Sequence, residues 1–297
     1  LGPVVVLLLS VALAPLGELG ARIVFAHLAL VAIVLTIMRR SMKESTLWQD
    51  AKQAAERDPR RPPAERNSMW SPATLRQLFT SQSLKSMLFL IAMYGTWNLW
   101  AGTNGFFFPY ILRTVGAQSQ AASVALQASG FTVAMISIGF VFMRYSDRVS
   151  QRKMMGVAGL MQVAGMLLLA LFPLTAPVAL GYQFLLQFGG GFGQQSFFQL
   201  WSAELFPTLA RSTAQGVMFA VVRISLGLWS FFVPLLTAEG FHRLAWILTG
   251  FVAVSSLIGF LGAPSNEGKS LTEIEAREFQ GSPAAAYARE KSDGRLQ

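Results

Sequence analysis

The chain has 297 residues, of which 53% are hydrophobic and only 13% are charged, and its net charge is +9. A soluble domain usually has about 25% charged residues, so this composition excludes an ordinary soluble protein and indicates one that spans a bilayer. The absence of cysteine excludes disulfides and thiolate metal sites, and the two histidines, His27 and His242, belong to no cluster of metal-ligand residues.

Continuous apolar runs of about 20 residues recur along the chain. They predict an all-α membrane protein, because the strands of a membrane barrel would alternate polar and apolar residues instead. We predict spans at residues 1–16, 21–38, 86–112, 119–143, 154–172, 177–203, 210–237 and 244–262. The first run has no preceding Met or basic flank, so we expect it to be a truncated helix that further residues precede.

A long polar connection at 39–85 separates the first two spans from the other six. Residues 45–57 contain no helix breaker, and Ser71 followed by Pro72 has the pattern of a helix start. We therefore expect short surface helices within this linker. The predicted domains are two helices of an N-terminal bundle, a cytoplasmic linker, a six-helix bundle and a cytoplasmic tail, at residues 1–38, 39–85, 86–262 and 263–297.

The distribution of basic residues predicts the orientation of the chain in the membrane. Placing 39–85 in the cytoplasm also places 144–153, 204–211 and the tail there, with 20 of the 24 Lys and Arg residues. The reverse orientation would violate the positive-inside rule. This topology accounts for the net positive charge, so we predict no nucleic-acid partner.

The third predicted span contains polar residues among aromatic ones. Asn98 and Asn104 are costly in hydrocarbon unless other groups bond them. Gly102, Gly105 and Pro109 weaken the helix near its outer end. Aromatic rings beside amides suit a polyhydroxylated ligand, because rings cover C–H faces and amides bond hydroxyls. The alternative is that the Asn residues serve helix packing and the rings form an interfacial belt.

Two further helices carry polar stripes at helical spacing. A stripe on the fourth span indicates either close packing or a pore wall and consists of Ser123, Gln127, Gly130, Ala134 and Ser137. A face of the sixth span, interrupted by Gly189, Gly190, Gly191 and Gly193, carries Gln183, Gln187, Gln194 and Gln195. Gln199 lies off that face. Four Gln residues on one face indicate the lining of a path.

A carboxylate and arginines lie near the connection between the sixth and seventh spans. Glu204 and Arg211 flank Pro207, which indicates a pair of charges at one membrane face. Arg223 lies 12 residues beyond Arg211, so its depth is about 18 Å along a helix. Arginine there normally faces a bundle interior. Two interpretations remain open for Arg223: a structural contact with carbonyls, or a role in the transport path.

Four motifs give the chain a specific resemblance. Asp147–Lys153 resembles the Asp-Arg-x-Gly-Arg-Arg loop of the major facilitator superfamily. Ala203–Arg211 and Pro264–Glu275 resemble the Ser-Glu-x-Phe-Pro-Thr-x-x-Arg motif and the tail motif of its sugar porter family, and Met42–Ser45 lies where that family has Pro-Glu-Ser-Pro-Arg. The motifs occur in the family's order, and the resemblance covers essentially the whole chain.

The resemblance implies a carrier of twelve helices that works by alternating access, with this chain starting inside the fifth helix. It also implies a location in the plasma or inner membrane, with the proton-coupling carboxylate on helices that precede this chain. It implies a cytoplasmic gate in which Glu204 pairs with Arg148 or Arg152. We assign gating or coupling roles to Glu44, Asp147, Arg148, Arg152, Glu204, Arg211 and Arg223.

The family's sugar contacts lie in a Gln-Gln-x-Ser-Gly-x-Asn motif, and Asn98, Gly102 and Asn104 match three of its positions. Leu99 replaces the second Gln, and Gln199 stands where sugar porters have a Trp. These departures favour a cyclic polyol such as an inositol over glucose. We expect one midplane cavity lined by Asn98, Asn104, Gln194, Gln195 and Gln199.

The sequence therefore predicts a secondary active transporter of a sugar or cyclic polyol, coupled to protons. One alternative is a carrier of small organic anions, which Arg223 would suit. Another is a nutrient sensor with the same fold that does not transport. We expect no enzymatic activity and no cofactor, because the sequence shows no nucleophile–base pair and no metal-ligand constellation.

Overall fold

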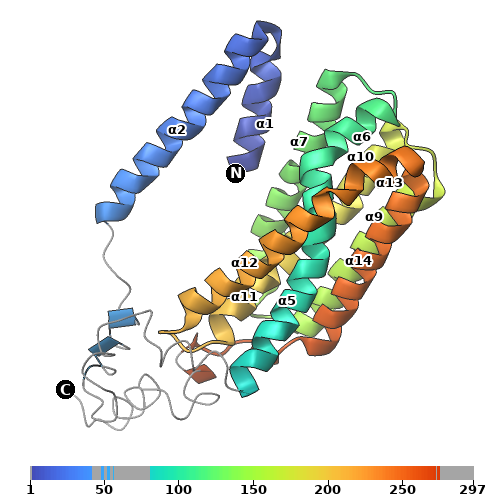
Figure 1. Ribbon diagram of the computed structural model, residues 1–297. Coiled ribbons are helices and arrows are strands. Elements are labelled where there is room, and N and C mark those ends of the chain that lie inside the picture. Colours follow the sequence, from blue (N-terminus) through green and yellow to red (C-terminus); the bar gives the residue numbers. More distant parts are fainter. Residues whose placement is uncertain are drawn as a thin grey trace.

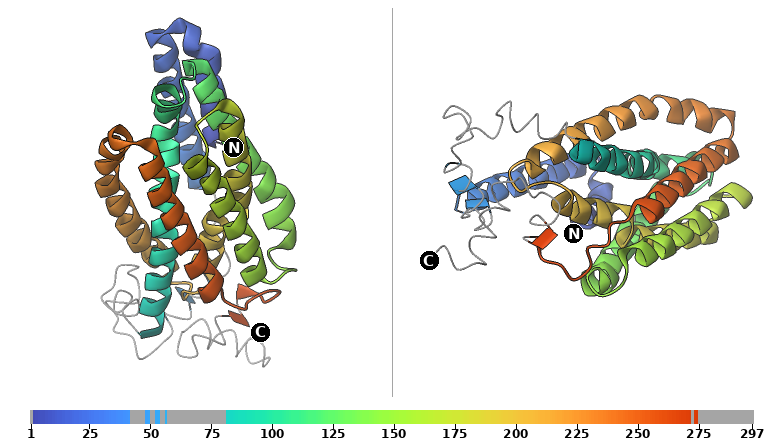
Figure 2. Two further views of the ribbon diagram at one scale, coloured as in Figure 1. Left: turned by 90° about the vertical axis from the view of Figure 1, so that its right-hand side faces the viewer. Right: turned by 90° about the horizontal axis from the view of Figure 1, so that it is seen from below.

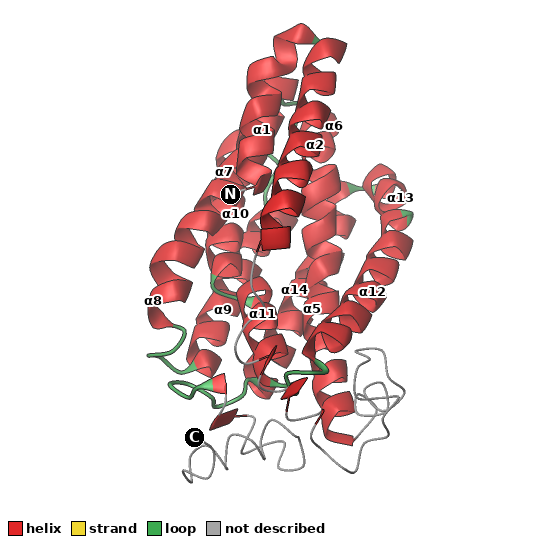
Figure 3. Ribbon diagram, turned by 90° about the vertical axis from the view of Figure 1, so that its left-hand side faces the viewer, coloured by secondary structure: helices red, strands yellow, loops and turns green. Residues whose placement is uncertain are grey.

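The computed structural model describes residues 2–41, 48, 49, 52, 53, 56, 81–271, 273 and 274. Within these residues the secondary structure is helical, with no strand (Figure 3). The linker helix predicted from Ser71 lies outside the described residues, as does most of the one predicted at 45–57.

A helix occupies each of the predicted span positions (Figure 1). The α-helices are α1 Gly2–Leu13, α2 Glu18–Ser41, α5 Ser81–Gly102, α6 Phe108–Thr114, α7 Gln120–Ser137, α8 Met143–Tyr145, α9 Gln151–Leu171, α10 Ala176–Gly191, α11 Gln194–Glu204, α12 Arg211–Ser230, α13 Phe232–Glu239 and α14 Phe241–Gly262. A 3-10 turn η1 (Ala14–Leu16) and π-helical turns η3 (Thr103–Phe107) and η4 (Ile138–Phe142) complete the described elements. Several helices begin three to five residues before the predicted spans, because helical hydrogen bonding continues beyond the apolar segment.

Five helical segments of the described chain are long and apolar enough to cross a membrane. They are Glu18–Arg40, Gln120–Tyr145, Gln151–Leu171, Arg211–Glu239 and Phe241–Gly262. The other predicted spans are the short α1, the more polar α5 with its π-helical continuation, and the pair α10 and α11, each shorter than 18 residues. This chain is therefore a multi-pass membrane protein.

The six later spans form one bundle. In this bundle α12 contacts α5, α5 contacts α14, α14 contacts α9, α9 contacts α10, and α10 contacts α7. In addition, α1 packs on α7, and α2 packs on α1. Figure 1 shows the α1–α2 hairpin beside the bundle, and Figure 2 shows the same bundle from two further directions. Small residues permit the close contacts: a Cβ at Gly165 of α9 would lie 3.0 Å from the backbone nitrogen of Leu186 of α10.

Two spans are irregular where the sequence predicts weakness. The π-helical turn η3 follows Gly102 directly. The sixth span breaks after Gly191, and Phe192 and Gly193 separate α10 from α11. A π-helical turn and a helix break both leave backbone groups for other partners, and both features are frequent at functional sites.

Candidate functional site

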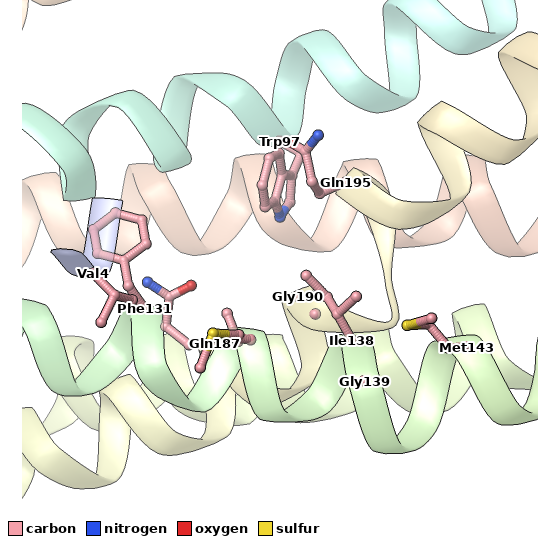
Figure 4. A pocket seen from close by; sticks show the side chains of 12 residues that line it. Val4, Trp97, Phe131, Ile138, Gly139, Met143, Gln187, Gly190 and Gln195 are labelled. Atoms are coloured by element: carbon pink, nitrogen blue, oxygen red, sulfur yellow. The ribbon is translucent and has the colours of Figure 1, made fainter. Parts of the chain in front are cut away.

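A cavity of about 560 Å³ lies between α1, α5, the α7–η4 segment, α10 and α11. Figure 4 shows its labelled residues arranged around the open space. The lining is mainly apolar and consists of Val4, Trp97, Phe131, Ala134, Met135, Ile138, Gly139, Met143, Gln187, Gly190, Gly191 and Gln195. Ligand sites typically combine such a lining with a few polar groups that fix orientation.

The polar groups of this lining are two amides and an indole. Gln187 of α10 and Gln195 of α11 contribute the amides. The hydroxyl of Tyr94 donates to Oε1 of Gln195 over 2.9 Å, which fixes that amide against α5. The indole N–H of Trp97 donates to Oε1 of Gln162 over 2.9 Å. Trp97 therefore presents its ring to the cavity while its donor is already used.

Close packing of α7 against α10 shapes one wall of the cavity. The hydroxyl of Ser137 donates to the carbonyl of Phe188 over 2.5 Å. A Cβ at Gly191 would lie 2.6 Å from the Cβ of Ser137, so only glycine fits there without movement. The polar stripe predicted on the fourth span is therefore a packing surface, and only Ala134 of that stripe lines the cavity.

At the other end of α11 the tail folds back onto the bundle. The amide of Asn266 donates to Oε2 of Glu204 over 3.2 Å, and both residues are buried. Oε1 of Glu267 accepts from the backbone nitrogen of Gln151 over 2.7 Å, at the first turn of α9. The tail thereby connects the ends of α9 and α11, where a carboxylate satisfies a helix N-terminus.

Glu204 lies beyond the predicted span 177–203, in an environment rich in carboxylates. Burial raises the pKa of its carboxyl group to about 7. The hydrogen bond from Asn266 opposes this rise in pKa, whereas the negative charges of Asp147 and Glu267 add to it. The pKa of Glu204 thus lies close to neutral pH.

Comparison with known proteins defines the family. The sequence model of the family described as the Major Facilitator Superfamily matches residues 1–229 of this chain. This chain belongs to the Major Facilitator Superfamily. It is also similar to the minor myo-inositol transporter IolF of Bacillus subtilis (strain 168), with 41% identity over 283 residues, which are 95% of this chain and 63% of that protein. The chain thus spans less than two thirds of this relative.

Superfamily membership and an all-helical membrane fold confirm the predicted class of protein. Of the five amides predicted to line one cavity, Gln195 lines this one, and the predicted five-amide site stays a prediction. Asn98 is buried and donates to the carbonyl of Tyr94 in its own helix. Gln199 is exposed on α11.

Asn104 and Gln194 are buried within the protein instead of lining the cavity. Oδ1 of Asn104 accepts from the hydroxyl of Tyr182 over 2.8 Å, and the backbone carbonyl of Asn104 accepts from the side-chain amide of Gln127. Gln194 is bonded to Gln162 and to a serine of α14. Satisfied amides of this kind stabilise helix contacts. Gly102 packs against Leu226, whose Cδ1 would lie 2.2 Å from an added Cβ.

The predicted ion pair of Glu204 with Arg148 or Arg152 is not among the ion pairs of the described residues. Both arginines are exposed, and the guanidinium of Arg152 lies 4.7 Å from the ring centre of Phe260. Asn266 occupies the position beside Glu204 that the prediction gave to an arginine. Glu44 lies outside the described residues.

Arg223 is exposed on α12, on a face that also exposes Gly216 and Gly227. A Cβ at either glycine would meet nothing within 4 Å in the described chain. The structure places all three away from the packed core of the described helices. Its role in coupling stays a prediction.

Sequence reasoning missed Trp97 and Gln162. Trp97 stands among the aromatic residues of the third predicted span, and the structure places it at the cavity. The available signal for Gln162 was its place as the one amide in the apolar segment 154–171 of α9. Such an amide needs buried partners, but the sequence does not say which helices supply them.

Proposed function

We propose that this chain forms part of a secondary active transporter of a sugar or cyclic polyol, with myo-inositol as the first candidate substrate. The observation that carries the proposal is 41% identity to a protein named as a myo-inositol transporter, over 95% of this chain. The chemistry of the cavity supports it independently.

The cavity suits a ring with apolar C–H faces and hydroxyl edges. The indole of Trp97 and the aliphatic lining would cover the C–H faces, while the amides of Gln187 and Gln195 would bond hydroxyls. None of the residues that line this cavity carries a charge. A neutral polyol therefore fits better than an anion, whose charge would have no partner in this lining.

The mechanism we propose is alternating access with proton symport. The broken helix α10–α11 connects the cavity, through Gln195, to the cytoplasmic cluster at Glu204, so a tilt of α11 would change both ends together. At the end of the bundle where Glu204 lies, Asp147 and Arg148 are on the connection before α9, and Arg152 and Arg211 are in the first turns of α9 and α12. These four residues would contribute to the cytoplasmic gate. The distribution of Lys and Arg supports a protein of the cell membrane whose C-terminus is cytoplasmic.

Uptake by cells that express the complete natural protein tests this function. Labelled myo-inositol, hexoses and small carboxylates are supplied separately, with and without a protonophore. We expect saturable uptake of a polyol that the protonophore reduces. Absence of polyol uptake from correctly inserted protein would leave the sensor interpretation.

One observation favours a second candidate, a carrier of small organic anions. The exposed guanidinium of Arg223 has no ion pair among the described residues. If Arg223 binds an anionic substrate, the carboxylates of the panel are taken up, and Arg223→Lys abolishes this uptake because Lys lacks a planar pair of donors. Uptake of polyols alone would reject this candidate.

A further inference from the structure

One polar residue of α9, Gln162, lies directly behind the cavity wall. Its side chain is fully buried, and its Oε1 accepts the indole N–H of Trp97 over 2.9 Å. Its Nε2 donates to Oε1 of Gln194 over 2.5 Å and to the carbonyl of Ala158 over 3.2 Å. Both hydrogens and one acceptor site of the amide are therefore used, as a buried amide requires.

The hydrogen bonds continue from Gln194 to α14. Nε2 of Gln194 donates to the hydroxyl of Ser256 over 2.9 Å, and that hydroxyl donates to the carbonyl of Val252 over 2.7 Å. An indole N–H can only donate and a backbone carbonyl can only accept. The two ends therefore determine the orientation of both amides between them, and one chain of bonds joins α5, α9, α11 and α14.

The glycines around the helix break are packed against the same side chain. A Cβ at Gly193 would lie 2.9 Å from Nε2 of Gln162, and a Cβ at Gly189 would lie 3.1 Å from its Cγ. A Cβ at Gly190 would lie 3.8 Å from both Oε1 of Gln162 and the ring of Trp97. The break between α10 and α11 thus closes around the amide of Gln162.

We propose that Gln162 is a positioning residue for the ligand of the cavity, an inference that rests on the proposed function. By accepting the N–H of Trp97, Gln162 uses the one donor of the indole. The indole ring then faces the C–H face of a polyol with no free donor. By bonding Gln194, it holds the first turn of α11, in which the next residue, Gln195, presents its amide to the cavity. One buried amide thereby sets the distance between the apolar and the polar contact of the site.

The variant Gln162→Leu tests this role in the complete natural protein, purified and reconstituted into proteoliposomes. The measurement is the equilibrium exchange of labelled myo-inositol as a function of its concentration. We expect KM to rise about ten-fold or more, because the indole N–H of Trp97 and the side-chain oxygen of Gln194 both lose Gln162 as their hydrogen-bond partner. The matched control is Gln183→Leu. The sequence places Gln183 on the Gln face of the sixth span, but in the structure its buried amide donates to the carbonyl of Leu126 and does not line the cavity. We expect its KM to stay within about two-fold of the parent value.

A double-mutant cycle with Trp97→Phe separates positioning from general stability. Phe keeps an aromatic ring and removes the N–H that Gln162 accepts. If Gln162 acts through Trp97, the rise in KM caused by Gln162→Leu is smaller in the Trp97→Phe background than in the parent. Thermal unfolding of each variant shows whether a change of KM accompanies a change of stability.

The outcomes distinguish the two levels of inference. Exchange by the parent with an unchanged KM in Gln162→Leu would overturn the role of Gln162 and leave the proposed function intact. A rise in KM caused by Gln162→Leu that is the same in the parent and in the Trp97→Phe background would also overturn it, since the two residues would then act separately. A parent that exchanges no polyol would overturn the proposed function, and this role with it. If Gln162→Leu fails to insert, an unchanged KM in Trp97→Phe would still contradict the proposal.

Discussion

Two polar clusters hold the six-helix bundle together at different depths, and they differ in charge. Behind the cavity, Gln162 and Gln194 form a neutral chain of hydrogen bonds in which each amide has buried partners. At the end of α11, Glu204 is buried beside the carboxylates of Asp147 and Glu267. A neutral cluster avoids the cost of a charge in hydrocarbon and is independent of pH, whereas a cluster of carboxylates at the membrane surface responds to it.

Of the two clusters, the neutral one borders the cavity at Trp97, and a substitution there should have the largest effect on stability and exchange. Trp97→Ala removes a ring that packs on Trp100 and Tyr94 and lines the cavity. We expect a loss of about 3–5 kcal/mol in unfolding free energy and no saturable exchange of polyol in the accessible range. Thermal unfolding and exchange assays measure both. The matched control is Trp246→Ala, whose side chain is 50% exposed on α14 and which should retain exchange. Normal exchange by Trp97→Ala would remove the ring from the site.

The second prediction distinguishes the site found in the structure from the site expected from motifs. Gln195→Ala removes an amide that lines the cavity, whereas Gln199→Ala removes an exposed amide of the same helix. Loss of one good hydrogen bond to a ligand costs about 1–3 kcal/mol, so we expect Gln195→Ala to raise KM about ten-fold. We expect a much smaller change for Gln199→Ala. The reverse ranking of the two KM values would restore the assignment from motifs.

A third prediction concerns Asn104, which the motif resemblance placed in the sugar site. Its side chain accepts from Tyr182 and is buried, so Asn104→Ala should lower the unfolding free energy by about 1–3 kcal/mol. Its KM should change less than that of Gln195→Ala. Thermal unfolding and exchange measured on the same preparations test this division. A ten-fold rise in KM without loss of stability would return Asn104 to the site.

The smallest expected effect belongs to the charged cluster and depends on pH. The raised pKa of Glu204 means that the folded protein binds its proton more tightly than the unfolded chain. Stability from this group therefore falls as pH rises from about 4.5 to about 7 and stays low above that window. Glu204→Gln keeps an acceptor for Asn266 without the charge, so we expect it to unfold a few degrees above the parent at about pH 8 and to match the parent below about pH 4.5.

The control for this prediction is Glu239→Gln, which changes an exposed ion pair with Arg243 at the opposite end of the bundle. Exposed pairs contribute about 0–1 kcal/mol, so its unfolding temperature should stay near the parent value at every pH. A pH dependence that is the same in parent and Glu204→Gln would show that Glu204 does not titrate in this window.

The sequence predicted the helices well because hydropathy and helix-breaking residues are local properties. The break in the sixth span was placed among Gly189 to Gly193, and the structure interrupts the helix at Phe192 and Gly193. The irregular outer end of the third span was expected from Gly102, Gly105 and Pro109, and a π-helical turn lies there. Family membership also followed from the four motifs.

The site was predicted less well, because helical spacing fixes which residues share a face and leaves open what that face meets. Gln194 and Gln195 are adjacent in sequence, yet one bonds a buried amide of α9 and the other lines the cavity. The rotation of α11 after the break decides this difference. Likewise Asn266, far along the chain from Glu204, takes the place expected for an arginine because the tail folds back onto α11.

The amino-acid sequence by itself determined the membrane-spanning helices, their breaks and the superfamily, since each depends on residues close together in the chain. Only the tertiary structure decided which amides face the cavity and which are consumed in buried hydrogen bonds. The physical reason is that a buried amide must bond whichever neighbours the packing supplies. Those neighbours, such as Trp97 for Gln162 across 65 positions of the chain, come together only when the helices pack.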